Sequence, residues 1–129
     1  MAVNYLLLID DSDIDNMINR RIIEKNGFAA QVVIKKSARA ALDFLVETFN
    51  REPEALPDLI FLDIRMPDMD GFGFLDAFAH LDKSIHKRCK IAMLSSSIDA
   101  DDHRRALENP FVVRFLNKPL TSQALNEVI

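Results

Sequence analysis

LIFLDIRMPDMDG, residues 59–71, joins an apolar run to an acidic turn. The apolar run stops at Asp63, and Pro67, Asp68 and Asp70 follow shortly after it. A short, continuous apolar run is typical of a strand that is buried on both faces of a parallel sheet. Such a strand would carry the Asp63 carboxylate at the rim of the sheet. The role of that carboxylate therefore depends on which other side chains reach the same rim.

Runs of the same kind recur along the chain and alternate with helical patterns. The predicted strands are residues 5–9, 29–35, 58–62, 90–94 and 111–116. Helices are predicted between and after them, because apolar residues return there at three- and four-residue spacing. This alternation predicts an α/β fold, in which a doubly wound (βα)5 chain places helices on both faces of a five-stranded parallel sheet. No linker or change of composition interrupts the pattern, so residues 1–129 are expected to form a single domain.

The predicted helices carry start and stop signals. The first ends at Asn26-Gly27, and Ser37 and Thr121 are candidate N-caps of the second and last helices. In the first helix, apolar residues recur at helical spacing and are expected to pack on the sheet: Ile14, Met17, Ile18 and Ile22. The polar residues of this amphipathic helix lie between them: Asp15, Asn16, Asn19 and Arg20.

The composition excludes several classes of protein. The chain has only three glycines, too few for a Walker loop or a GxGxxG fingerprint. Its formal charge is −4 and it has no basic block, so direct binding to nucleic acid is not expected. The single Cys89 excludes an internal disulfide and is expected to pack as a small apolar side chain. The apolar residues 5–9 are too few for a membrane span and lack the features of a signal peptide, which predicts a soluble, cytoplasmic protein.

Polar and charged residues follow four of the predicted strands. They are Asp10 and Asp11, then Asp63, then Ser95, Ser96 and Ser97, then Asn117, Lys118 and Pro119. Open parallel sheets bind ligands beyond the carboxyl ends of their strands, near the point where the strand order reverses. If the first and third strands are neighbours, the carboxylates of Asp10, Asp11 and Asp63 meet at one crevice.

Three carboxylates at one place repel one another and raise each other's pKa. Mg²⁺ relieves such repulsion, because it binds one or two carboxylates, keeps several waters and leaves room for a phosphate oxygen. Lys118 adds a positive charge suited to phosphate, and Ser95 adds a hydroxyl donor. Together these groups are the components of phosphoryl transfer onto an aspartate. Taken alone, Asp10-Asp11 could instead be a pair of acids at a helix N-terminus.

Four motifs at the strand ends now identify a family. The sequence resembles a receiver domain of a two-component response regulator, and the resemblance covers essentially the whole chain. The matching motifs, in order, are LLLIDD (6–11), LIFLDIRMPDMDG (59–71), AMLSSS (92–97) and FLNKPL (115–120). The resemblance implies a flavodoxin-like sheet in the strand order 2-1-3-4-5. It also implies a switch that accepts a phosphoryl group on Asp63 from a histidine kinase or a histidine phosphotransfer protein.

The resemblance also implies roles for the other residues of the site. Asp11, Asp63 and the backbone carbonyl of Arg65 would bind Mg²⁺ directly, and Asp10 would act largely through a metal-bound water. Ser95 and Lys118 would hold the phosphoryl oxygens. The Lys118–Pro119 peptide bond is expected to be cis, as in the family.

Further positions would govern switching and the lifetime of the phosphoryl group. Phe115 matches the switch aromatic, which turns inward as Ser95 is drawn toward the phosphoryl group. Because Phe115 lacks the hydroxyl of the tyrosine found in many relatives, we expect it to be buried more often even without phosphate. Arg65 and Ser97 match the positions that tune the phosphoryl lifetime, and a long Arg65 over the phosphoryl group predicts slow self-dephosphorylation.

Two alternatives to the signalling switch stay open. A haloacid-dehalogenase-type phosphatase also uses an aspartate nucleophile, but it needs a second acid where this chain has Arg65. A pseudo-receiver would fold and bind partners without ever taking phosphate. The resemblance implies no enzyme activity beyond assistance of the chain's own phosphorylation and dephosphorylation. It implies a downstream protein partner of unknown identity and no membrane partner. It also allows a phosphorylation-dependent dimer.

Several other residues have plainer interpretations. Asp68 and Asp70 are expected to serve the turn and the start of the next helix. The three histidines, His80, His86 and His103, lack the spacing of metal ligands and are expected at the surface.

Overall fold

The computed structural model describes residues 3–96 and 99–128 and contains a five-stranded parallel sheet in the order β2-β1-β3-β4-β5. The strands are β1 (Val3–Ile9), β2 (Ala29–Lys35), β3 (Leu59–Asp63), β4 (Lys90–Ser95) and β5 (Val112–Asn117). The predicted α/β class and the predicted strand order are both confirmed.

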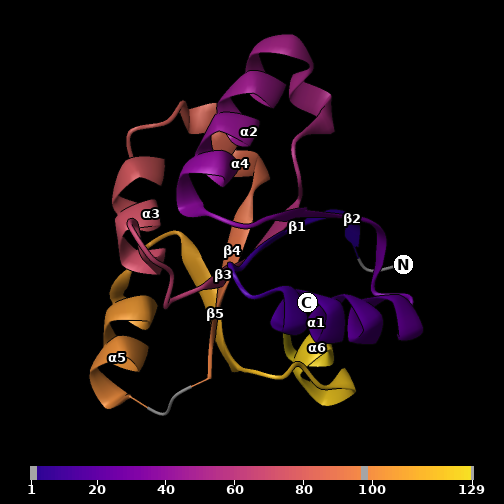
Figure 1. The fold of residues 1–129 in the computed structure, drawn as a ribbon. Coiled ribbons are helices and arrows are strands. Elements are labelled where there is room, and N and C mark those ends of the chain that lie inside the picture. The colour runs from indigo at the N-terminus through magenta and orange to yellow at the C-terminus, as the bar shows by residue number, and fades with distance from the viewer. Residues whose placement is uncertain (1–2, 97–98, 129) are drawn as a thin grey trace.

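Helices cover both faces of this sheet (Figure 1). They are α1 (Asp13–Lys25), α2 (Ala38–Arg51), α3 (Gly71–Phe78), α4 (Lys83–Arg88), α5 (Ala100–Glu108) and α6 (Ser122–Val128), with a 3-10 turn η1 (Pro53–Ala55) after α2. Helices α1 and α6 share one core cluster with the sheet, and α2 to α5 share the other. The fold is therefore a three-layer sandwich.

The two core clusters explain why the central strands are apolar at every position. In β1, Leu7 faces the α2–α5 layer and Leu6 faces the α1–α6 layer, and neither side chain is exposed. Alternate residues of a strand point to opposite faces, so a strand with two covered faces needs apolar residues throughout. The edge strands β2 and β5 are only partly buried.

Three strands extend one residue further than predicted. Asp63, Ser95 and Asn117 are the last residues of β3, β4 and β5. Their backbones still pair, as Asp63 lies opposite Leu94 and Ser95 lies opposite Asn117. A polar side chain does not stop its own backbone from joining the ladder. The consequence is that Asp63 and Ser95 are held by the sheet itself.

The orientation of α1 differs from the prediction. Asn16 and Asn19 are buried with Ile23, whereas Ile14 and Met17 are 65% and 55% exposed. Asn16 donates from Nδ2 to the Asp10 carbonyl (2.8 Å), and Asn19 accepts from the Leu120 backbone N–H (3.3 Å). The helix thus turns its amides toward neighbouring loops that have backbone groups to satisfy. The apolar pattern of the helix alone cannot reveal that neighbouring loops need these hydrogen bonds.

Helix α4 was not predicted. It has only six residues, which is too short for an apolar period to show. Asp82 caps it by accepting from the Ser84 N–H (2.8 Å). The predicted caps are confirmed, because Ser37 and Thr121 accept from backbone N–H groups three residues on, each at 3.1 Å.

Two further predictions concern side-chain environment. Cys89 is buried, as predicted for a small apolar side chain. His86 is half-buried rather than at the surface, with its ring against Phe78 and Phe111 and its Nε2 at 2.6 Å from the Phe78 carbonyl oxygen. The imidazole packs between two aromatic rings. The spacing of the histidines along the chain does not reveal this packing. None of the helices in residues 3–96 and 99–128 is long and apolar enough to cross a membrane.

Candidate functional site

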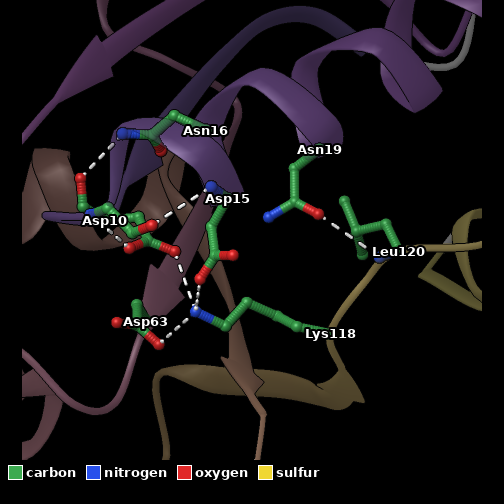
Figure 2. Close-up of polar contacts among 8 residues, drawn as sticks. Asp10, Asp15, Asn16, Asn19, Asp63, Lys118 and Leu120 are labelled. Atoms are coloured by element: carbon green, nitrogen blue, oxygen red, sulfur yellow. Dashed lines mark hydrogen bonds and ion pairs between the residues drawn. The ribbon is translucent and has the colours of Figure 1, made fainter.

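The carboxyl ends of β1, β3, β4 and β5 lie at one edge of the parallel sheet. Asp10 and Asp11 follow β1, Asp63 ends β3, Ser95 ends β4 and Lys118 follows β5. Parallel strands bring their carboxyl ends to the same edge, which is why residues far apart in sequence meet there. Figure 2 shows Asp10, Asp63 and Lys118 converging from these elements.

The acids form a compact cluster. Oxygen atoms of Asp10, Asp11 and Asp63 all lie within 4.8 Å of one another. Asp10 is fully buried and Asp63 is 3% exposed, whereas Asp11 faces solvent. Asp10 also accepts from the Ser12 backbone N–H at 3.0 Å, which orients its carboxylate. Asp10 and Asp63 are therefore enclosed by the protein, and Asp11 is the exposed member of the cluster.

One ammonium group serves this cluster. Lys118 Nζ lies 2.9 Å from Asp10 Oδ2, 2.9 Å from Asp15 Oδ2 and 3.0 Å from Asp63 Oδ1. The lysine side chain is only 7% exposed. An ammonium group has three hydrogens to donate, so these three carboxylates can engage all of them.

The pKa values of Asp63 and Lys118 both reflect the excess of carboxylates over ammonium groups in the cluster. Burial, with the charges of Asp10 and Asp11, raises the pKa of Asp63 to about 6, although Lys118 opposes the shift. Burial alone would lower the pKa of Lys118, but its hydrogen bonds to Asp15, Asp10 and Asp63 outweigh burial and raise it. The two directions have one physical cause. A single ammonium group is shared among several carboxylates, so Lys118 is surrounded by excess negative charge, whereas Asp63 has only a share of one positive charge.

The site therefore suits a divalent cation. Asp10, Asp11, Asp15 and Asp63 carry four negative charges against the single charge of Lys118. Carboxylate and carbonyl oxygens are the ligands that Mg²⁺ prefers, and its charge would offset the excess. The donor set fits Mg²⁺ at Asp10, Asp11 and Asp63.

Helix α1 holds two loops of the site in place. Through Asn16 it binds the carbonyl of Asp10, and through Asn19 it binds the N–H of Leu120, just beyond Lys118. The Lys118–Pro119 peptide bond is cis, as predicted. The N–H of Lys118 donates to the Ser95 carbonyl (2.8 Å), which joins the ends of β4 and β5.

The sequence predictions missed Asp15, Asn16 and Asn19 as residues of this site. Asp15 lies in the first turn of α1, four residues after Asp11, which precedes the helix. That spacing was available in the sequence. However, acids in a first helical turn are common for electrostatic reasons, and their spacing alone does not distinguish a residue of the site.

Arg65 lies two residues beyond Asp63, but its side chain points to α5. The guanidinium forms a short ion pair with Asp102 and lies 3.8 Å from Asp99. The Asp102 side chain is 7% exposed, whereas that of Arg65 is 58% exposed. Asp99 caps α5 by accepting from the N–H groups of Asp101 and Asp102. Arg65 thus links the loop after β3 to the start of α5.

The candidate switch residues lie on adjoining strands. Ser95 is buried at the end of β4. Phe115 on β5 is half-buried and stacks on His103 of α5, with ring centroids 4.7 Å apart. Ser97 lies outside the described residues. The preference of Phe115 for a buried position stays a prediction, because its ring lies neither in the core nor free in solvent.

The acidic turn after β3 has a structural role, as predicted. Asp70 caps α3 by accepting from the Gly73 N–H at 2.8 Å. Asp68 has a left-handed backbone (φ 69°), and its carboxylate lies 2.6 Å from Nε of Arg39 on α2. These acids shape the turn that leads from Asp63 into α3.

Comparisons with known proteins agree with this geometry. The family model described as "Response regulator receiver domain" matches residues 6–129. The chain is 27% identical over 124 residues to the chemotaxis protein CheY of Bacillus subtilis, covering 96% of each chain. Two other curated relatives are longer proteins, and the chain spans 15% and 29% of their lengths.

Solved structures show the same likeness. A two-component response regulator from Cytophaga hutchinsonii superimposes with a TM-score of 0.91 at 31% identity, covering 99% of this chain and 95% of that one. The Mn²⁺-bound form of the response regulator Rcp1 superimposes with a TM-score of 0.74 at 25% identity, covering 97% and 88%. The fold, the acid cluster and the family match lead to one conclusion: this chain belongs to the response regulator receiver domain family.

Proposed function

We propose that the chain is a phosphorylation-dependent switch that accepts a phosphoryl group on Asp63 with the help of Mg²⁺. The observation that carries this proposal is the position of the Asp63 carboxylate. It lies in hydrogen-bonding reach of Lys118, within 4.8 Å of two further acids, and at the open edge of the sheet. The donor would be a histidine kinase or a histidine phosphotransfer protein.

The proposed transfer needs no further reactant. An oxygen of the Asp63 carboxylate attacks the phosphorus atom of the donor and forms a new P–O bond. The bond between phosphorus and the donor breaks, and the donor atom leaves with the electron pair. Lys118 donates hydrogen bonds to the phosphoryl oxygens, and the Ser95 hydroxyl donates another. The product is an acyl phosphate on Asp63.

The metal would be held by Asp10, Asp11, Asp63 and the backbone carbonyl of Arg65, with Asp10 acting largely through a water. When bound, Mg²⁺ would supply positive charge beside the transferred group and offset the crowding of carboxylates. The solved structure of the relative Rcp1 is a Mn²⁺-bound form, which supports the proposal of a divalent ion.

The output of the switch would pass through Ser95, Phe115 and α5. A phosphoryl group on Asp63 would draw the Ser95 hydroxyl, and Phe115 would turn into the space that this movement leaves. Phe115 stacks on His103, so its movement would alter the exposed surface of α5. A downstream protein that reads this surface, or a second copy of the chain, would sense the change.

The phosphodonor protein would dock beside the site on α1. Ile14, Met17 and Ile18 are 65%, 55% and 40% exposed on this helix, next to the acid cluster. Exposed apolar residues grouped on one helix are typical of a protein-binding surface.

The proposal is tested by phosphorylation with a small donor. The protein is incubated with Mg²⁺ and acetyl phosphate, and its intact mass is measured beside that of Asp63→Asn. We expect one added phosphoryl group in the wild type and none in the variant. If a folded wild-type protein gains no phosphoryl group from acetyl phosphate or from any histidine phosphotransfer donor, the pseudo-receiver alternative is favoured. Steady release of phosphate from small phosphomonoesters would instead favour the phosphatase alternative.

A further inference from the structure

All three hydrogens of the Lys118 ammonium group are engaged by carboxylates in this structure. Its three acceptors are carboxylates on three different elements: Asp10 after β1, Asp15 on α1 and Asp63 on β3 (Figure 2). A phosphoryl group on Asp63 would bring new anionic oxygens that also need this ammonium. The hydrogen now donated to Asp63 can pass to one phosphoryl oxygen, and a second phosphoryl oxygen can be served only if Asp10 or Asp15 gives up its hydrogen bond.

The three acceptors differ in how readily they can do so. Asp10 is fully buried, accepts from the Ser12 N–H and is held through its carbonyl by Asn16. Asp63 carries the incoming group. The Asp15 side chain is 38% exposed, so its carboxylate can turn to water at small cost. Asp15 is therefore the acceptor that would lose its hydrogen bond from Lys118 to the phosphoryl group.

We propose that Asp15 competes with the phosphoryl group for Lys118 and so restrains the phosphorylation of Asp63. The inference rests on the proposed function of Asp63 as phosphoryl acceptor. Two effects act in the same direction. The Asp15 carboxylate must be displaced from Lys118, and its negative charge remains beside an anion that is being bound.

The Asp15→Asn variant isolates this effect. Asparagine has nearly the same size and keeps an oxygen that can accept from Lys118, but it carries no charge. Asp13→Asn is the matched control. Asp13 lies in the same first turn of α1 and has the same charge, but it pairs with Lys36 at 2.7 Å and its side chain is 78% exposed. Both variants thus change the net charge and the helix terminus equally.

The first measurement is the initial rate of phosphoryl gain from acetyl phosphate at saturating Mg²⁺, followed by intact mass. In this reaction Asp63 forms a bond to phosphorus while acetate leaves with the electron pair of the broken P–O bond. We expect Asp15→Asn to react roughly three- to tenfold faster than wild type, the effect of one nearby, partly screened charge. Asp13→Asn should react at the wild-type rate.

The second measurement does not require phosphoryl transfer. Beryllofluoride, a phosphoryl mimic, is titrated into each protein at saturating Mg²⁺ and its affinity is measured by calorimetry. Asp15→Asn should bind it more tightly by a similar factor, whereas Asp13→Asn should match wild type. Thermal unfolding of the three proteins verifies that the differences do not come from a loss of fold.

The outcomes separate the two proposals. If wild type takes phosphoryl or beryllofluoride and Asp15→Asn behaves like Asp13→Asn, or is slower and weaker, the role of Asp15 is refuted and the proposed function stands. If no protein in the set reacts with acetyl phosphate or binds beryllofluoride, the proposed function fails and the role of Asp15 fails with it.

Discussion

At the scale of single residues, the ionised form of Asp63 carries an electrostatic cost. Its pKa is raised to about 6, chiefly by burial, so the folded protein binds a proton there more tightly than the unfolded chain does. A raised carboxyl pKa makes stability fall as pH rises from the unfolded value toward the folded one. The cost at neutral pH is at most about 3 kcal/mol, at 1.36 kcal/mol per unit of pKa shift, because solvent screening reduces it.

The first prediction follows from this cost. In buffer without Mg²⁺, Asp63→Asn should raise the free energy of unfolding by up to about 3 kcal/mol at pH 7.5, and the gain should shrink as pH falls from 6 to 4. Urea unfolding at several pH values measures it. A gain that is the same at pH 4 and pH 7.5 would mean that the Asp63 charge is not its cause.

A second prediction concerns Arg65, which Asp102 and a phosphoryl group on Asp63 would both attract. Arg65→Ala should speed loss of the phosphoryl group, and Asp102→Asn, which removes the shorter of the two ion pairs of the guanidinium, should slow it. Each effect should be roughly two- to fivefold, the size expected of one partly screened ion pair. The decay is followed by intact mass after the donor is removed.

The control for this pair is Arg104→Ala. Arg104 lies on the same helix as Asp102 but pairs with Asp101 and Glu108, both exposed. Its loss should leave the decay rate unchanged. Equal decay in wild type, Arg65→Ala and Asp102→Asn would remove Arg65 from the residues that tune the lifetime.

At the scale of elements, the start of α3 lies against the end of β3. A Cβ on Gly71 would come within 2.8 Å of the Asp63 carbonyl oxygen and 2.9 Å of Ile64 Cα, both backbone atoms. The Gly71 N–H donates to the Ile64 carbonyl at 2.9 Å. The close approach needs a residue without a side chain, and it fixes the loop that follows Asp63.

The third prediction is that Gly71→Ala lowers the free energy of unfolding by about 1–3 kcal/mol, because backbone must move to admit the methyl group. The matched change is Gly73→Ala, two residues on in α3. There the nearest atom is in the side chain of Met69 at 2.9 Å, and that half-buried side chain can rotate. Its cost should be within about 1 kcal/mol of zero, since alanine favours the helix. Equal losses in urea unfolding would contradict the argument.

Helix α1 shows how one element can serve two purposes. Its buried amides hold the loops that carry Asp10 and Lys118, and its apolar residues Ile14 and Met17 face outward. The helical period was readable in the sequence, but the side that faces the sheet was not. Ile23 anchors the helix in the core, and buried amides take the positions beside it.

At the scale of the whole molecule, binding of a divalent cation at the acid cluster would be coupled to folding. A cation that binds only the folded state stabilises it, by about 2.7 kcal/mol at a concentration one hundred times its Kd. The fourth prediction is that Mg²⁺ raises the thermal unfolding temperature of the wild type at constant ionic strength. Asp11→Asn should lose most of this rise, and Asp13→Asn should keep it. A rise that survives in Asp11→Asn would place the ion elsewhere.

The sequence by itself determined the α/β class, the parallel sheet and the residues at its edge. Continuous apolar runs mark strands with two covered faces, and a polar residue at the end of each run marks the rim. For this reason Asp10, Asp11, Asp63, Ser95 and Lys118 could be named in advance. These signals are local, and each can be read within a few residues of chain.

Only the tertiary structure decided how those residues share charge. The three carboxylates around Lys118, the link from Arg65 to α5 and the inward face of α1 each join segments far apart in the sequence. A side chain finds such a partner by its direction and distance in space, and neither is encoded in spacing along one segment. The restraint that we assign to Asp15 lies in that second class, because it exists only where α1 meets the end of β5.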